Sequence, residues 1–387
     1  MNDVSPVNQI RVAIIGTAKR SSYLYGPILK ALAEEVRLVS VWGRSSESAK
    51  DLGNELGVPW YSDIDQLISE TDPQVGIVCV AYQANGEVGI MAIEHGLHVL
   101  LETPIAHKLS EADTIIRAAR QRGIKVEVAE QFHRRPQEQL KLKLIESGIF
   151  GRVYASFNDF AGHGYHGVSV LRSYLGFNTK PIQVVGASQH NQLMAHWSRL
   201  EGEFGPREET QEHGIITFED GRLGIFHWTD VGYDSALRWW RSSRFYAEKG
   251  MGISVGVGFE VNEQLTLLSP DGRSPQFITV EREYERVDGG ALVALVAHTG
   301  NPEHPTVRWE NPFNSVSKVR GIQWHDDEIG VASCLMSLAN AIRNDTVPSY
   351  GAEQARLDQE ILLAIQKSAK ENGIPVKLPL DLSEYEE

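Results

Sequence analysis

The first third of the chain alternates short apolar runs with stretches of helical periodicity. The apolar runs are unbroken, which is typical of strands that are buried on both faces of a sheet. The strands predicted from them are Arg11–Ile15, Val36–Val41, Val75–Ala81, His98–Leu101 and Lys125–Ala129. Between them, apolar residues recur with a helical period, as in Pro27–Glu35 and Ser110–Arg122. Strands that alternate with helices pair in parallel, so residues 1–129 are predicted to form a doubly wound α/β domain of the Rossmann type.

The pattern changes after Pro136, where a helix over Gln137–Ser147 is followed by longer, alternating runs. Alternation of apolar and polar residues indicates antiparallel strands, and Asp220-Gly221 is a hairpin signal. The predicted strands are Val153–Asn158, Ile182–Gln189, Glu212–Glu219, Arg222–Asp230 and Phe277–Glu283, and the predicted closing helices are Glu328–Arg343 and Gly351–Asn372. Residues 130–387 are therefore predicted to form an α+β domain on an open antiparallel sheet. Its last helix is expected to return towards the first domain.

Length and charge narrow the possible functions. The chain has 387 residues, with 37 Lys and Arg against 51 Asp and Glu, a formal net charge of −14. This charge repels nucleic acid and anionic lipid, so neither is expected as a partner. Two cysteines, Cys79 and Cys334, cannot build a disulfide framework. We see no signal peptide and no apolar run of ~20 residues, which predicts a soluble, cytoplasmic protein of two domains.

A glycine turn follows the first predicted strand and precedes a helix, which is a typical site for a pyrophosphate. Gly16, Ala18 and Ser21 occupy the three positions that require small residues, and Lys19 and Arg20 could pair with phosphate charge. Ala18 places a methyl group where the phosphate approaches. The alternative is a plain strand-to-helix turn without a ligand.

The end of the second predicted strand bears on the choice of cofactor. A domain that prefers NAD usually carries an acidic residue there to bind the ribose hydroxyls. Here Gly43 is followed by Arg44 and Ser45, which suit a 2′-phosphate better, so NADP is slightly favoured over NAD. Alternatively, Arg44 is a solvated charge at a helix start.

The run from Gly96 to Ala106 resembles the central motif of the Gfo/Idh/MocA family (glucose–fructose oxidoreductase, inositol dehydrogenase, rhizopine catabolism). Further segments match that family in order and spacing: Asn85–Gly96, Phe132–Pro136, Ile149–Val153 and His166–Gly176. The resemblance implies a nicotinamide cofactor and oxidation or reduction of a sugar or cyclitol hydroxyl between the two domains. It also implies a homodimer or homotetramer formed through the C-terminal sheet.

The motif residues carry over unevenly. Glu102 and Pro104 match, and with Asn85 they are expected near the cofactor, but the family's lysine is replaced by Thr103. Threonine can hydrogen-bond an oxygen but cannot act as a base near neutral pH. The family's histidine corresponds to His166, which is therefore the expected acid/base, with Tyr165 and Thr103 orienting the reacting oxygen.

Three segments contribute candidate substrate ligands. The residues are Glu130, His133, Arg134, His163, His227 and Trp228. No metal is predicted, although Glu130, His133, His163, His166 and His227 supply enough nitrogen and oxygen donors for a divalent ion if they converge. The alternative is that several of these histidines bind carbohydrate or lie on the surface.

Aromatic residues gather in one stretch of the C-terminal domain. They are Trp228, Tyr233, Trp239, Trp240, Phe245 and Tyr246, with Arg241 and Arg244 among them. Such a set suits sugar rings and carboxylates, or equally a subunit interface. Asp326–Glu328, after Trp324 and His325, indicate a helix N-terminus.

Three functions remain open at this point. The first is an NAD(P)-dependent oxidoreductase that acts on a sugar, glycoside or cyclitol. The second is a redox-neutral lyase or hydrolase on a keto-sugar that uses the histidine and glutamate residues, with or without a metal. The third is a non-catalytic sensor of a sugar or dinucleotide.

Overall fold

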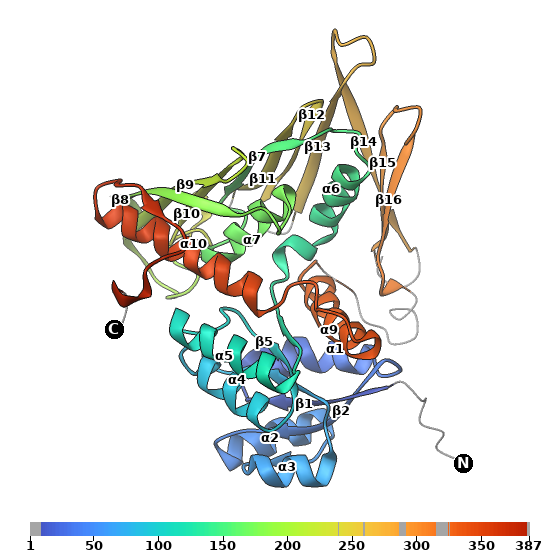
Figure 1. Cartoon of the computed structure of the whole chain (residues 1–387), viewed down its shortest axis with the longest axis vertical. Helices are drawn as coiled ribbons and strands as arrows, with labels where there is room; N and C mark the ends of the chain where they lie inside the picture. The colour runs from blue at the N-terminus through green and yellow to red at the C-terminus, as the bar shows by residue number, and fades with distance from the viewer. Residues whose placement is uncertain are drawn as a thin grey trace. The chain divides into compact units, whose positions relative to one another are not determined.

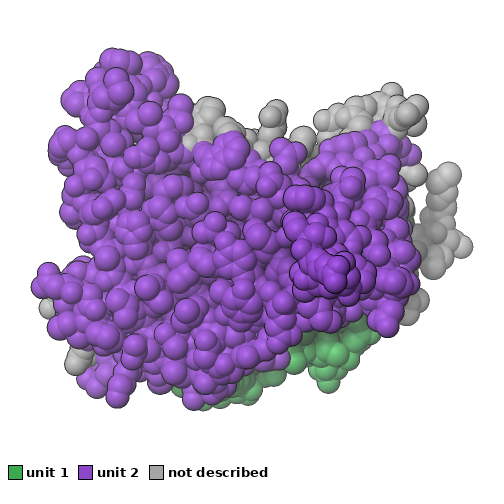
Figure 2. Space-filling view, turned by 90° about the horizontal axis from the view of Figure 1, so that it is seen from above, with its two compact units in different colours: residues 1–131, 286–291, 312–356 green, residues 132–285, 292–311, 357–387 purple. Residues whose placement is uncertain are grey.

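A computed structural model describes residues 9–238, 240–257, 260–285, 292–314, 324 and 326–384. The chain divides into two compact units, shown in Figure 2. Unit 1 comprises residues 1–131, 286–291 and 312–356, and unit 2 comprises residues 132–285, 292–311 and 357–387. Two residues singled out in the sequence, Trp239 and His325, lie outside the described residues.

Unit 1 contains a six-stranded parallel sheet in the order β3-β2-β1-β4-β5-β6 (Figure 1). The strands are β1 Ile10–Ile15, β2 Val36–Trp42, β3 Trp60–Tyr61, β4 Val75–Val78, β5 His98–Leu101 and β6 Val126–Val128. The helices are α1 Gly26–Ala31, α2 Ser46–Leu56, α3 Ile64–Thr71, α4 Asn85–Glu94, α5 Leu109–Arg122 and α9 Asp326–Asn344. This strand order is that of dinucleotide-binding Rossmann domains, so the predicted doubly wound sheet is confirmed.

Two elements of unit 1 end earlier than the sequence predicts. Strand β4 ends at Val78, before the predicted Ala81, and the carbonyl of Cys79 accepts a hydrogen bond from the amide of Ala18. A π-helical turn at Ser21–Tyr25 precedes α1, which ends at Ala31 rather than at Glu35.

Unit 2 is built on an eleven-stranded sheet in the order β16-β15-β14-β13-β12-β11-β7-β10-β9-β8-β17. The strands are β7 Val153–Asp159, β8 Pro181–Trp197, β9 Phe204–Phe218, β10 Leu223–Thr229, β11 Trp240–Ala247, β12 Gly250–Val257, β13 Glu260–Leu268, β14 Pro275–Tyr284, β15 Leu292–His298, β16 Thr306–Glu310 and β17 Val376–Lys377. The helices are α6 Pro136–Glu146, α7 Gly164–Leu175 and α10 Ala352–Lys370.

The sheet of unit 2 is not wholly antiparallel, because β7 and β10 run parallel. The chain crosses from β7 to β8 through α7, and β8 runs in the same direction as β7. Two hairpins then join β8 to β9 and β9 to β10, so β10 also runs in this direction. The predicted hairpin between β9 and β10 is confirmed: Gly221 has φ +82°, and the Phe218 amide donates to the Arg222 carbonyl at 3.0 Å.

Helices α6, α7 and α10 lie on one face of this sheet, which we call the covered face (Figure 1). Ser156, Gly186 and Ser243 point to it, since they contact α7, α10 and α6 respectively. Side chains alternate along a strand, so their neighbours point to the opposite, open face. Residues of the open face include Phe157, Asp159, Ile215, Ile225 and His227.

The last helix begins beside α5 and ends on the sheet of unit 2. In unit 1, Arg356 Nε pairs with Asp113 Oδ1 at 2.9 Å. Further along α10, Ser368 Oγ accepts a hydrogen bond from the Gly186 amide at 2.8 Å, and Ile365 lies over Gly186 and Gly214. Among the described helices, none combines the length and the apolar composition needed to cross a bilayer.

We predict that Gly186→Ala lowers the free energy of unfolding by roughly 1–3 kcal/mol, as overpacking of a close contact usually does. A Cβ at Gly186 would lie 2.0 Å from the carbonyl oxygen of Ile365, which is helix backbone and cannot rotate away. Gly205→Ala, on β9, is the matched control, because a Cβ there meets nothing within 4 Å. Urea denaturation measures both, and equal destabilisation would contradict this packing.

Candidate functional site

The glycine turn of unit 1 is closely packed between the ends of β2 and β4. Gly16 has φ +121°, and a Cβ there would lie 2.2 Å from the carbonyl oxygen of Cys79. The Gly16 amide donates to the Trp42 carbonyl at 2.9 Å, and Ser21 Oγ donates to the Gly16 carbonyl at 3.2 Å. Only glycine fits at position 16, and Ser21 fixes the turn from within.

Arg20, for which the sequence predicts pairing with a phosphate, is also bound within unit 1 through one of its nitrogens. Its Nε donates to Glu102 Oε1 at 2.9 Å, and the Tyr25 hydroxyl donates to the same oxygen at 2.7 Å. Burial, with the charge of Glu102, raises the pKa of Tyr25 well above its usual value, so this hydroxyl remains a donor. Glu102 is 8% exposed. Its bond with Arg20 joins the glycine turn to the central motif.

Asn85, the first residue of α4, holds the motif segment in place. Its Nδ2 donates to the Glu102 carbonyl and to the Pro104 carbonyl, the latter at 2.6 Å. Thr103 lies between these two anchored residues and is partly exposed. The residue in the family's lysine position is thus held firmly but carries no charge.

Two polar atoms beside Glu102 show that this end of the sheet fits a polar ligand. Arg20 Nη2, a donor, and Asn85 Oδ1, an acceptor, are buried and have no hydrogen-bond partner in the part of the chain that the structure describes. Buried polar atoms normally have partners, because leaving them without one costs about 1–3 kcal/mol. Lys19 is exposed beside the turn. These residues fit a dinucleotide.

The predicted 2′-phosphate residues lie at the surface after β2. Ser45 caps α2, since its Oγ accepts a hydrogen bond from the Ser48 amide at 3.4 Å. Arg44 is exposed, and it forms no ion pair with any described residue. An exposed arginine beside a helix N-terminus is compatible with binding a phosphate group.

In unit 2, His166 lies on α7 and is 3% exposed. Its ring stacks on Phe132 with centroids 4.4 Å apart, and the rings of His163 and Tyr165 lie at 4.5 Å. Asn158 on β7 fixes the loop before α7, because its side chain donates to the Gly162 carbonyl at 2.9 Å and accepts from the Gly162 amide at 2.8 Å. The glycines of this loop allow this close fit, because a Cβ at Gly162 would lie 2.7 Å from the Gly167 amide nitrogen.

His133 lies within the protein rather than at its surface. Its Nδ1 is 3.0 Å from Ser169 Oγ, and its ring packs edge-on against Phe177. Burial lowers the pKa of His133 well below its usual value, and the charges of Arg134 and Arg172 add to this effect. The imidazole of His133 is therefore neutral near pH 7.

His163 belongs to an aromatic group on the covered side of the sheet. Its ring centroid is 5.6 Å from Trp228 and 5.3 Å from Tyr233, and its Nδ1 lies 3.3 Å from the Tyr233 hydroxyl. The Arg241 guanidinium lies over the Tyr233 ring, with Cζ 4.3 Å from the centroid. Trp228 is buried and packs against the rings of both His163 and Tyr233.

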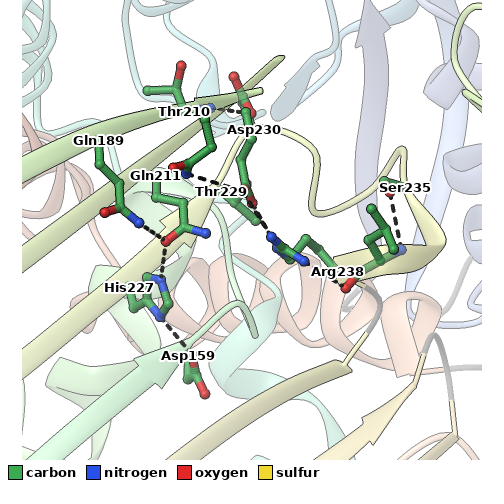
Figure 3. Close-up of polar contacts among 12 residues, drawn as sticks. Asp159, Gln189, Thr210, Gln211, His227, Thr229, Asp230, Ser235 and Arg238 are labelled. Carbon is green, nitrogen blue, oxygen red and sulfur yellow. Dashed lines mark hydrogen bonds and ion pairs between the residues drawn. The ribbon is translucent and has the colours of Figure 1, made fainter. Parts of the chain in front are cut away.

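His227 was expected beside His163 and His166, and this expectation is wrong. It points to the open face, where its Nδ1 lies 2.9 Å from Asp159 Oδ1 and its Nε2 lies 3.3 Å from Gln211 Oε1 (Figure 3). The reason is the alternation of β10, which turns Trp228 to the covered side and His227 away from it. The hydrogen bond from His227 is the main cause that lowers the pKa of Asp159.

The possible metal ligands do not form one group. Glu130 is fully buried in unit 1, whereas the four histidines belong to unit 2, with His227 on the open face. Across the described ranges, no group of three or more His, Cys, Asp and Glu side chains is placed to hold a metal ion.

The aromatic stretch is likewise divided between the two faces. Phe245 packs edge-on against the buried ring of Phe150, whereas Tyr246 packs against Phe157 on the open face. The Arg244 guanidinium lies over Phe157 at 4.4 Å. The sequence therefore overestimated this set as a single patch.

One buried ion pair near the histidines was missed. Arg172 Nη1 pairs with Asp358 Oδ1, and both side chains are fully buried, which joins α7 to α10. The two residues are 186 positions apart in the chain, so no local spacing could have linked them.

We predict that His133 makes the protein less stable in mild acid. The unfolded chain binds a proton at this position below about pH 6.5, whereas the buried native imidazole does not, so stability falls as the pH decreases. For one proton the slope is at most about 1.4 kcal/mol per pH unit. His133→Asn keeps a polar atom near Ser169 and does not titrate, so its stability should change less between pH 6.5 and 5.

Urea denaturation at several pH values measures these slopes, with His190→Asn as the matched exposed substitution. Equal slopes for the wild-type protein and His133→Asn would contradict this account of the buried imidazole.

Comparison with known proteins finds a family match in the first third of the chain. The Gfo/Idh/MocA family, described as an oxidoreductase family with an NAD-binding Rossmann fold, matches residues 10–130. A 2,7-anhydro-N-acetylneuraminate hydratase of Mediterraneibacter gnavus is 24% identical over 298 residues, which is 71% of this chain and 74% of that protein. The scyllo-inositol 2-dehydrogenase (NADP(+)) IolU of Bacillus subtilis is 26% identical over 39% of this chain and 46% of its own length.

Among solved structures, the WlbA dehydrogenase from Bordetella pertussis, in complex with NADH and UDP-GlcNAcA, has a similar fold. The TM-score is 0.66 at 17% identity, with 97% of this chain and 99% of that chain covered. The likeness extends over both units, so the Rossmann domain and the open-sheet domain are confirmed together. Residues 10–130 therefore match the NAD-binding Rossmann domain of the Gfo/Idh/MocA oxidoreductase family.

Proposed function

We propose that the protein is an NAD(P)-dependent dehydrogenase or reductase that interconverts a hydroxyl and a carbonyl group on a sugar, glycoside or cyclitol. The observation that carries this proposal is the unpartnered donor of Arg20 and acceptor of Asn85 beside Glu102, in a sheet with dinucleotide-binding strand order. A nicotinamide cofactor, when bound, exchanges hydride with the substrate carbon. We assign cofactor binding to residues 1–129, and substrate binding and assembly to residues 130–387.

The residues that would hold the cofactor come from three segments of unit 1. They are Gly16, Ala18, Lys19, Arg20 and Ser21 of the turn, Arg44 and Ser45 after β2, and Asn85, Glu102 and Pro104 around the motif. Arg44 supports a preference for NADP, since it offers a positive charge where NAD-specific domains carry an acidic residue. Arg20 would contribute through Nη2, because its Nε is bound to Glu102.

We assign the proton of the reacting hydroxyl to the imidazole of His166. Thr103 cannot serve as a base, so this role falls to an imidazole, which can accept the proton. The contact with Phe132 fixes the plane of the His166 ring, and the neighbouring His133 adds no charge to it at pH 7. Thr103 and Tyr165 orient the reacting oxygen in this proposal.

The substrate class rests on the relatives, several of which are named as dehydrogenases of sugars or cyclitols. Among the predicted substrate ligands, Glu130, His133, Arg134 and His163 are retained, with Trp228 acting through its support of His163. His227 is withdrawn because it lies on the open face. We also propose a location in the cytoplasm, where a buried thiol such as that of Cys79 stays reduced.

We predict that His166→Ala lowers kcat by about 10²–10⁴-fold, the usual effect of losing a general acid/base. The Kd for NADPH should stay within about threefold, because the cofactor residues lie in unit 1. Steady-state assays of nicotinamide absorbance and a binding titration measure the two quantities. His190→Ala, an exposed imidazole in unit 2, is the control. A kcat close to that of the wild-type enzyme would remove His166 from this role.

We propose that a second copy of the chain covers the open face of unit 2. This face carries Phe157 and Ile225, partly exposed, and Ile215, 47% exposed, around a hollow of about 640 Å³. The hollow is also lined by Asp159, His227 and Arg244, and a contiguous exposed patch with apolar and charged groups is typical of an interaction surface. The resemblance to the family supports the same assembly, as a dimer or a tetramer.

We predict that Ile225→Glu shifts the sedimentation coefficient towards that of the monomer, because an added charge that is buried in the interface must be desolvated. Val347→Glu, at an 85% exposed position in unit 1, should leave the assembly unchanged. Sedimentation velocity distinguishes these outcomes. A wild-type protein that sediments as a monomer at micromolar concentration would refute the assembly.

A further inference from the structure

The open face of unit 2 carries two rows of side chains that run across five strands, in the order β8, β9, β10, β7 and β11. The first row is mostly polar and consists of Ala187, His213, His227, Asp159 and Ser242. The second row is apolar up to its last residue and consists of Val185, Ile215, Ile225, Phe157 and Arg244. Residues of both rows line the hollow of about 640 Å³.

Most polar groups of the first row are bound to one another. His227 Nδ1 lies 2.9 Å from Asp159 Oδ1, and its Nε2 lies 3.3 Å from Gln211 Oε1, which also accepts from Gln189 Nε2 at 2.9 Å (Figure 3). The His213 ring stacks on that of His227 with centroids 4.4 Å apart. Burial, with the charge of His227, lowers the pKa of His213, so His213 adds no charge to the hollow near pH 7.

Arg244 ends the second row with a charge that the described residues leave unpaired. Its Cζ lies 4.4 Å from the ring centroid of Phe157 and 5.9 Å from that of Tyr246. Over the ranges that the structure describes, its guanidinium forms no ion pair and no hydrogen bond, and Nε is buried without a partner. Since buried polar groups normally have partners, Arg244 is suited to bind an acceptor from outside the chain.

The size and the floor of the hollow indicate the shape of such a ligand. Pockets for small molecules usually measure about 300–1,000 Å³, and the hollow lies within this range. Neighbouring strands lie about 4.8 Å apart, so a row across five strands is roughly 19 Å long, which suits an elongated molecule. Val185, Ile215 and Ile225 offer an apolar surface to its body.

The charges of the hollow indicate the head group. A planar guanidinium suits the two oxygens of a carboxylate. Asp159 remains ionised, because the hydrogen bond from His227 lowers its pKa and the charge of Arg244 adds to this effect. A second negative charge on the ligand would therefore be repelled by Asp159, which favours a monocarboxylate over a dicarboxylate or a phosphate ester.

We propose that this hollow is a binding site for an aliphatic monocarboxylate, with the carboxylate on Arg244 and the chain on Ile225 and Ile215. The site lies on the opposite face of the sheet from His163, so it is separate from the proposed catalytic groups. A second copy of the chain on the open face encloses the hollow and shields the aliphatic chain from water.

Calorimetric titration of the full chain with sodium octanoate tests this proposal, and 1-octanol is the uncharged ligand of the same chain length. We expect saturable binding of one octanoate per chain. Arg244→Met should weaken octanoate binding about 10–100-fold, the usual effect of losing a hydrogen bond to a charged group, and leave 1-octanol within about threefold. Ile215→Ser should weaken both ligands, because it removes apolar surface from the floor.

The matched control is Arg199→Met, which removes an exposed arginine elsewhere in unit 2 and should leave both affinities unchanged. An equal loss of octanoate binding in Arg199→Met and Arg244→Met would indicate general attraction by positive charge and overturn the site. Equal affinity of the wild type and Arg244→Met for octanoate would do the same.

A wild-type protein that does not bind octanoate also overturns the proposal, and this is the result if the second copy fills the hollow with its own side chains. A thermal melt shows whether each variant folds. If Arg244→Met does not, Arg244→Lys keeps the charge without the planar fork and should weaken octanoate binding about threefold or more. Binding of NADPH is measured separately, so a failure here leaves the dehydrogenase function untouched.

Discussion

The strict alternation of side chains in strands β7 to β11 decides which chemical groups of unit 2 can act together. Because neighbouring residues of a strand point to opposite faces, Trp228 supports His163 while His227 faces Asp159 on the other side. The same rule separates Arg241 from Arg244. Helices α6, α7 and α10 cover one face only, so the sheet itself divides the candidate catalytic groups from the candidate assembly surface.

In unit 1 a single carboxylate has a comparable organising role. Glu102 accepts hydrogen bonds from Arg20 and Tyr25 through its side chain and from Asn85 through its carbonyl, so it joins the glycine turn, the π-helical turn and the start of α4. Thr103 follows directly and occupies the family's lysine position. A threonine here cannot act as a base, and for this reason we propose that His166 of unit 2 handles the proton. The threonine leaves the carboxylate that positions the turn in place.

Much of the architecture could be predicted, because parallel strands buried on both faces leave unbroken apolar runs and the hairpin at Asp220-Gly221 has a local signal. The second half of β8 could not be predicted: beyond Gln189 its residues are mostly exposed on both sides, so apolar alternation is absent. The parallel pairing of β7 with β10 depends on a crossover that no local pattern encodes.

For the candidate site, residue types were easier to identify than their neighbours. Spacing singled out His163, His166 and Glu102 as candidate site residues, but it could not show that His227 faces away or that Arg20 is bound to Glu102. Register and side-chain direction settle both points, and neither is visible before the strands are paired. The contact between Arg172 and Asp358 depends on α10 returning to α7 across 186 positions.

The account depends most on unit 1 holding a nicotinamide dinucleotide. A titration of the purified protein with NADPH and with NADH, followed by the fluorescence of the reduced nicotinamide, measures this directly. We expect saturable binding of one dinucleotide per chain, with a lower Kd for NADPH than for NADH. Fluorescence that stays unchanged with both dinucleotides up to millimolar concentration would contradict the redox function and leave only the fold.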